Sequence, residues 1–186
     1  LAFCACSDDE AGPSGSSTSS SGSPALDGGA GSTDSGTTSD DGGPVTPGGG
    51  TGALDATFKS PGGDVYDVGL LGGGKIVIGG AATGGAGWSK VAVLGPDGAV
   101  DPSFALAPNE VNNTVAAALP LPDGNVVIGG NFNNTGLVRI GRLGTDGKRD
   151  ASFNVSGAGA EGAVSALRRE PGGKILVSGY FTSYNG

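Results

Sequence analysis

A segment of about fifty residues occurs three times in this chain, and the third copy is incomplete. Val65–Gly80 aligns without a gap to Val115–Gly130, and both align to Val164–Gly179. A five-residue motif recurs in step with them at Leu54–Phe58, Val100–Phe104 and Arg149–Phe153. Repeats of this length are typical of solenoids, propellers or arrays, so they constrain the fold before any local pattern does.

The composition divides the chain near residue 53. Residues 7–53 are almost all Gly, Ser, Thr, Pro and Asp, and no Lys or Arg precedes Lys59. Seven acids and no base give this stretch most of the net charge of −8, whereas the repeat region, residues 54–186, is close to neutral, with eleven acids and ten bases. A stretch with so few apolar side chains cannot offset its ordering entropy. We expect residues 7–53 to form a disordered linker with a mean reach of about 35–40 Å.

The composition also argues against several classes of site. A neutral repeat region lacks the basic stripe of a nucleic-acid surface, so no nucleic-acid partner is expected. The chain has no His, and both of its Cys lie within the first six residues. We therefore expect no metal site, no cofactor and no Ser-His or Cys-His catalytic pair in the repeats. Carboxylate chemistry is what remains.

The first residues resemble the end of a bacterial lipoprotein signal peptide, which we assign to residues 1–6. An apolar stub, a small residue and a cysteine precede an abrupt acidic stretch rich in Ser and Gly. Ala5 before Cys6 suits a protease that needs a small residue, whereas Phe3 before Cys4 suits it poorly. Cys6 is thus the favoured lipidation site, with the linker as tether. A non-lipidated secretory signal and a chance pair of cysteines are the alternatives.

Each repeat carries cues for four antiparallel strands. A short apolar strand, a Gly-rich or Pro-Asp-Gly turn, a second apolar strand, a polar loop and a third strand follow one another. A second Asp-Gly turn then leads to the segment that ends at Phe104 or Phe153. Four strands joined in this way make one blade of a β-propeller, so the predicted fold is all-β with about two and three-quarter blades present.

The second strand supports stacking of blades. Val126-Val127-Ile128 and its counterparts are apolar at successive positions and do not alternate. A strand covered on both faces shows that pattern, as blade packed on blade would provide. We expect Phe58, Phe104 and Phe153 to pack between blades.

The repeat is similar to a known family. Pro171–Gly186 (PGGKILVSGYFTSYNG) and Arg139–Gly147 (RIGRLGTDG) resemble the delta-60 repeat, and the likeness extends over residues 54–186. Residues 81–88 depart from the usual aromatic-Thr-Tyr-Asn loop. The resemblance implies a bacterial β-propeller and no catalytic mechanism.

A closed propeller needs about four to eight blades. Gly186 aligns with Leu137, just before a third strand, so we expect further repeats in the complete protein. Residues 54–186 alone should be weakly stable, with an aggregation-prone face at the cut end.

The loops after the second strands are the candidate binding surface. Aromatics beside Asn and Thr suit stacking on a sugar or a peptide, and the candidates are Trp88, Phe132, Asn133, Tyr180, Phe181 and Tyr184. The competing interpretation, which we favour, is that Phe132 and Phe181 fill the blade junction. The turn aspartates (Asp97, Asp123, Asp146) and the strand-start aspartates (Asp55, Asp101, Asp150) are expected to have structural roles.

These patterns favour a non-catalytic interaction or ligand-binding propeller, lipid-anchored in the bacterial cell envelope, at the outer membrane or cell surface in preference to the inner membrane. Its ligand would be an unknown protein or carbohydrate. A propeller hydrolase or lyase acting on carbohydrate, with a site in the central channel, is one alternative. A structural or adhesive spacer array is the other.

Overall fold

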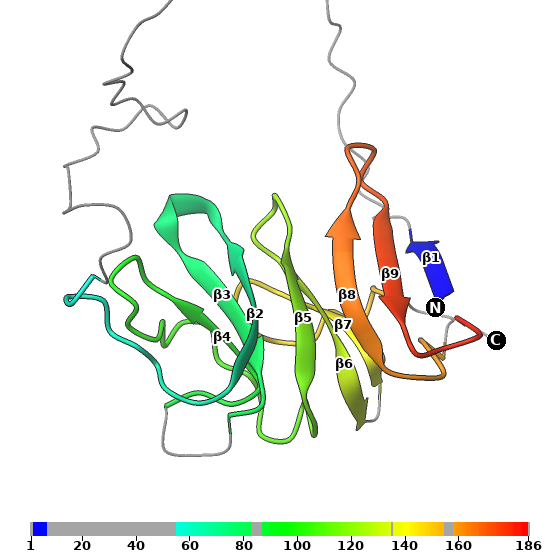
Figure 1. Ribbon diagram of the computed structural model, residues 1–186, viewed down its shortest axis with the longest axis horizontal. Coiled ribbons are helices and arrows are strands. Elements are labelled where there is room, and N and C mark those ends of the chain that lie inside the picture. Colours follow the sequence, from blue (N-terminus) through cyan, green and yellow to red (C-terminus); the bar gives the residue numbers. More distant parts are fainter. Residues whose placement is uncertain (1, 7–54, 83–86, 135, 155–157, 186) are drawn as a thin grey trace, which may run out of the picture. The chain divides into compact units, whose positions relative to one another are not determined.

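The computed structural model describes residues 2–6, 55–82, 87–134, 136–154 and 158–185 (Figure 1). Of residues 2–6 only the backbone is described, and the predicted linker of residues 7–53 lies outside the described residues. The strands are β1 Ala2–Cys6, β2 Val65–Leu70, β3 Ile76–Gly80, β4 Val91–Leu94, β5 Val115–Pro120, β6 Val126–Asn134, β7 Leu137–Leu143, β8 Val164–Arg169 and β9 Ile175–Gly179. A 3₁₀ turn, Gly72–Gly74, joins β2 to β3.

The strands form three antiparallel sheets that follow the three sequence repeats. Blade 1 is β2-β3-β4, blade 2 is β5-β6-β7, and blade 3 is β8-β9 with β1 at its edge. The first strands of the blades, β2, β5 and β8, lie next to one another (Figure 1). The predicted all-β fold of stacked blades is confirmed.

The fourth strands of blades 1 and 2 are shorter than predicted. Each is reduced to one isolated bridge, Leu94 with Val100 in blade 1 and Leu143 with Arg149 in blade 2. The next residues turn back locally, because Asp101 accepts hydrogen bonds from both the backbone and the hydroxyl of Ser103. Such side-chain bonds to the neighbouring backbone compete with a strand ladder.

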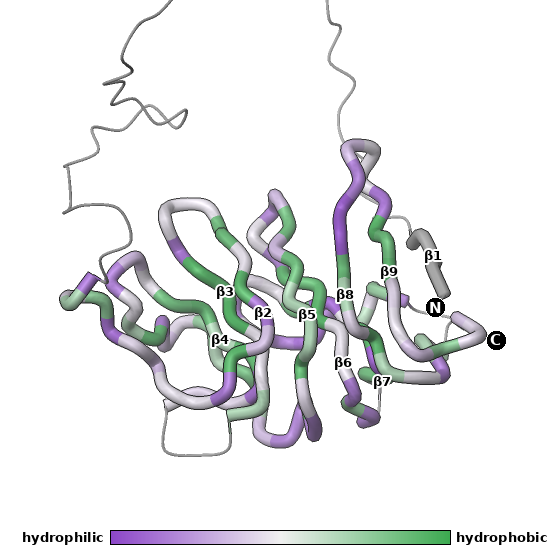
Figure 2. Tube along the Cα trace, viewed as in Figure 1, coloured by the Kyte–Doolittle hydropathy of each residue, from purple (hydrophilic) through white to green (hydrophobic). Residues whose placement is uncertain are grey.

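The core lies between the blades and is built on the second strands. In β6, Val126, Val127 and Ile128 are all fully buried, which confirms the prediction that this strand is covered on both faces. Val126 and Ile128 belong to the apolar cluster shared with blade 1, whereas Val127 belongs to the cluster shared with blade 3. Figure 2 shows such hydrophobic stretches along β3 and β9.

Glycines at one repeated position set how closely the blades approach. A Cβ atom added to Gly79 of β3 would lie 2.8 Å from a methyl group of Val115 on blade 2. A Cβ atom added to Gly129 of β6 would lie 2.5 Å from a methyl group of Val164 on blade 3. Any side chain at these positions would push the blades apart, which is why glycine occurs inside two otherwise aliphatic strands.

The recurrent phenylalanines pack at the junctions, but to different extents. Phe104 is buried in the cluster between blades 1 and 2, as predicted. Phe153 is half-buried against the cluster between blades 2 and 3. Phe58, at the outer side of blade 1, remains 38 % exposed.

The edge of β9 is occupied by β1. Cys6 lies opposite Ile175 and Cys4 opposite Val177. This register matches that of the third strands in the other blades, where Leu94 lies opposite Ile76 and Leu143 opposite Val126. The backbone of residues 2–6 thus takes the place of a third strand in blade 3.

The close approach of the next blade to Gly79 and Gly129 predicts a specific loss of stability. Gly129→Ala should lower the free energy of unfolding by about 1–3 kcal/mol, because the added methyl group overpacks the junction with Val164. The matched control is Gly172→Ala in the β8–β9 turn, where an added Cβ meets no atom within 4 Å. That control should change stability by no more than about 0.5 kcal/mol. Urea denaturation measures both, and equal effects would contradict the close-approach explanation.

Candidate functional site

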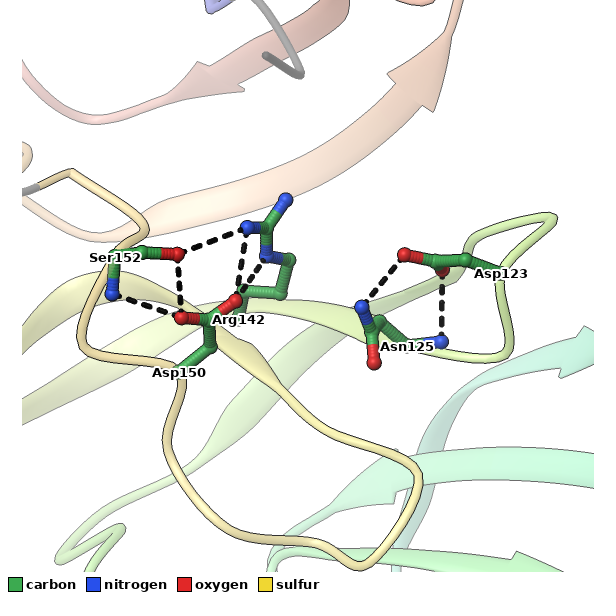
Figure 3. Close-up of polar contacts among 5 residues, drawn as sticks. All are labelled: Asp123, Asn125, Arg142, Asp150 and Ser152. Carbon is green, nitrogen blue, oxygen red and sulfur yellow. Dashed lines mark hydrogen bonds and ion pairs between the residues drawn. The ribbon is translucent and has the colours of Figure 1, made fainter. Parts of the chain in front are cut away.

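The turn aspartates have backbone roles, as predicted. In each case Oδ1 accepts a hydrogen bond from the backbone N–H two residues ahead: Asp97 from Ala99 (3.1 Å), Asp123 from Asn125 (2.9 Å) and Asp146 from Lys148 (3.0 Å). The glycine that follows each aspartate has a positive φ, the conformation that such turns require. Figure 3 shows this arrangement at Asp123, whose second oxygen also accepts from the Asn125 side chain.

The aspartate at the end of blade 2, Asp150, is bound on both oxygens (Figure 3). Its Oδ1 accepts from the backbone N–H and the hydroxyl of Ser152, at 2.8 and 2.7 Å. Its Oδ2 accepts from Nε of Arg142 at 2.8 Å, and the guanidinium also lies over the ring of Phe153. The hydrogen bond from the Ser152 hydroxyl makes the largest contribution to lowering the pKa of the Asp150 carboxyl, and Arg142 lowers it further.

Asp101 in blade 1 is held in the same way, but by a different cation. Its Oδ2 lies 2.8 Å from the ammonium of Lys75, and its Oδ1 accepts from Ser103. The Lys75 ammonium, with the Ser103 hydroxyl, lowers the pKa of Asp101 to about 2. A general acid at neutral pH needs a raised pKa, so Asp101 and Asp150 are suited to holding the strand end in place and unsuited to proton donation. The predicted structural role is confirmed for these two residues.

The candidate binding residues fall into two groups. Phe132 is fully buried, Phe181 and Trp88 are 5 % and 7 % exposed, and Trp88 donates its indole N–H to the Gly62 carbonyl at 2.9 Å. Tyr184 is half-buried, Asn133 is exposed, and Tyr180 is 85 % exposed. The packing interpretation is therefore confirmed for Phe132 and Phe181. Among the five aromatic candidates, Tyr180 has the most exposed side chain.

The polar groups of these loops bind their own chain. The backbone N–H and carbonyl of Asn133 pair with the side chain of Asn112 at 2.9 and 2.8 Å. The Thr182 and Ser183 hydroxyls both donate to the Glu161 carboxylate. These bonds fix each loop against the segment that enters its blade, so they give the loops a defined shape. A binding role for them stays a prediction.

A cleft that the sequence did not suggest lies at the turn end of blades 1 and 2. Its volume is about 670 Å³, and the β2–β3 and β5–β6 turns line it. The Lys75–Asp101 ion pair lies on its wall, together with Asp123 and Arg169. We call it the turn cleft. The signal that could have revealed it is the position of Lys75 directly beside the β2–β3 turn and of Arg169 directly beside the β8–β9 turn.

Among the described residues, no cluster of three or more His, Cys, Asp or Glu could hold a metal ion. Within the same residues, no helix is long and apolar enough to cross a membrane.

The lowered pKa of Asp101 predicts a pH-dependent contribution to stability. The folded pKa is about 2 and the ordinary value is 3.8, so this contribution is present above about pH 4 and is lost as the pH falls towards 2. Asp101→Asn should therefore destabilise the protein at pH 7 by about 1 kcal/mol, since the half-exposed Lys75 ammonium is screened by solvent. Urea denaturation at pH 7, 4 and 2 checks this. A difference between variant and parent that is the same at all three pH values would contradict it.

The difference in burial between the loop aromatics predicts unequal losses of stability when they are truncated. Phe132→Ala should cost about 3–5 kcal/mol of stability, because it empties a fully buried site. Tyr180→Ala should cost no more than about 0.5 kcal/mol, since its side chain is exposed. Thermal unfolding of the two variants measures the contrast. Similar losses in both would mean that Tyr180 also packs in the core.

Comparison with known proteins bears on the repeats alone. A family model described as a domain of unknown function (DUF5122) beta-propeller matches residues 74–104, 121–153 and 170–186. Comparison with curated proteins and with solved structures gives no significant match. The three matched stretches fall one in each blade and cover the second strands with their flanking turns. The repeats of this chain are therefore similar to those of a β-propeller repeat family.

Proposed function

We propose that this chain is a lipid-tethered β-propeller of the bacterial cell envelope that binds a ligand without catalysing a reaction. The absence of catalysis in this proposal is supported by the hydrogen bonds and the pKa values of the recurrent carboxylates. Asp101 and Asp150 are each held by a cation and a serine, and their pKa values are lowered. Carboxylates in this state lack the paired, separated pKa values of an acid–base site.

The ligand class follows from the groups that remain open. Tyr180 presents an exposed ring beside polar loop residues, a combination suited to stacking on a sugar ring or a peptide side chain. The turn cleft adds both signs of charge, with Lys75 and Arg169 near Asp123. A protein or carbohydrate ligand fits these surfaces better than a strongly charged polymer.

The tether rests on the sequence around Cys6. Acylation there would follow cleavage between Ala5 and Cys6, and the polar residues 7–53 would hold the blades away from the membrane. This cleavage would remove most of β1 from the edge of β9. β1 would therefore pair with β9 only in the uncleaved chain, and processing would leave the β9 edge open for another strand.

Metabolic labelling with a radioactive fatty acid tests the tether in bacterial cells that express the chain with a complete lipoprotein leader. The parent chain and Cys4→Ser should incorporate label and partition with membranes, whereas Cys6→Ser should lose nearly all label. Cys4→Ser is the matched control because it removes the same atom two residues away. Labelling lost in Cys4→Ser alone would overturn the choice of Cys6, and no labelling in any chain would overturn the lipid tether. A hydrolytic activity of the purified chain that Asp101→Asn abolishes would overturn the non-catalytic assignment.

A further inference from the structure

The turn cleft is lined by side chains from all three blades. Lys75 lines it from blade 1, Asp123 from blade 2 and Arg169 from blade 3. Its volume of about 670 Å³ lies within the range of sites that hold small ligands. The carboxyl end of β8, where Arg169 lies, is the hydrophilic part of that strand in Figure 2. The cleft therefore presents groups from three repeats to one ligand.

A difference between the repeats gives the cleft its apolar wall. In blade 2 the guanidinium of Arg142 holds Asp150 and lies 5.4 Å from the centroid of the Phe153 ring. In blade 1 Val93 stands at the position of Arg142 in the third strand. Without a guanidinium at that position, Val93 and Phe104 both line the cleft.

The charged groups of the cleft differ in what they already bind. Lys75 and Asp101 lie 2.8 Å apart and neutralise each other. Arg169 is exposed and, among the described residues, has no ion-pair or hydrogen-bond partner. Asp123 accepts two hydrogen bonds from Asn125, whereas an ionised carboxylate has about four acceptor sites. One positive and one negative group thus remain on the wall for a ligand.

A ligand that fits these groups carries both charges and an aliphatic body. A guanidinium binds a carboxylate through two parallel hydrogen bonds, and a carboxylate accepts from an ammonium. A sugar ring would need an exposed aromatic face to stack on. The aromatic side chain that lines the cleft, Phe104, is buried. A short peptide of aliphatic residues with both termini free has the required features.

We infer that the turn cleft binds a short zwitterionic peptide, with its carboxylate on Arg169, its ammonium on Asp123 and its aliphatic side chains against Val93. This inference rests on the proposed ligand-binding role and narrows the ligand of that role to a peptide. Because it engages both termini, the cleft would take short products of peptide hydrolysis and exclude an internal stretch of a protein.

A nuclear magnetic resonance titration of the whole chain tests the site with four forms of one dipeptide. Leucyl-leucine carries both charges, its N-acetyl form only the carboxylate, its amide form only the ammonium, and its N-acetyl amide form neither. Leucyl-leucine should shift the backbone amide signals of the β2–β3 and β5–β6 turns. It should bind at least about threefold more tightly than either singly charged form, since each terminus adds one ion pair.

Two variants that each remove one charge separate the two ends. Arg169→Gln should weaken the binding of leucyl-leucine and of its N-acetyl form at least about threefold, and leave the amide form unchanged. Asp123→Asn keeps an oxygen for the Asn125 N–H, and should weaken leucyl-leucine and its amide form while leaving the N-acetyl form unchanged. The matched control is Arg168→Gln, because Arg168 donates to the Leu167 carbonyl and does not line the cleft. This control should bind all four forms as the parent chain does.

Maltose is the carbohydrate probe in the same titration. Shifts with maltose and none with the dipeptides would overturn this inference and leave the proposed binding role in place, whereas no shift with any probe would count against both. Equal binding of all four dipeptide forms, or equal losses in Arg168→Gln and Arg169→Gln, would also overturn it. Signals far from the cleft that match those of the parent show that a variant is folded, so that a loss of binding reports on the site.

Discussion

The close approach of a glycine on one blade to a valine on the next is the contact on which the stacked fold depends. Gly79 and Gly129 let the second strand of one blade lie directly against the first strand of the next. Because of this approach, the aliphatic residues on both faces of β6 are fully buried. A sheet of three short strands could not bury them alone, so the blades gain their core from their neighbours.

The stacked core constrains where function can reside. The recurrent aromatics Phe104, Phe132 and Phe181 are used in the junctions. The recurrent aspartates are used at turns and at strand ends, where serines and cations hold them. What recurs in the repeats therefore serves the fold, and the proposed ligand would meet groups that differ between repeats, such as Tyr180 and Arg169.

Much of the fold could be predicted from sequence because it follows from period and turn chemistry. The fifty-residue repeat, the Asp-Gly turns and the unbroken apolar run of β6 were sufficient for blade number, strand order and core. The loss of the fourth strand was missed, because it depends on Asp101 bonding to Ser103 and not on propensity. The turn cleft was missed too, since Lys75 and Arg169 line one cleft only through the stacking of blades. The loops were predicted as a shared surface, but burial separates Trp88 from Tyr180, which no local pattern distinguishes.

The strands of the three repeats are similar, but one residue shows that their junctions are not equivalent. Blade 3 has Ser178 where the other two blades have glycine, so its outer side cannot accept a valine at the same distance. A serine there suits a neighbour with a smaller residue, or a wider junction. Chain connectivity sets the order of the blades, and the residue at this single contact sets how closely a following blade can approach.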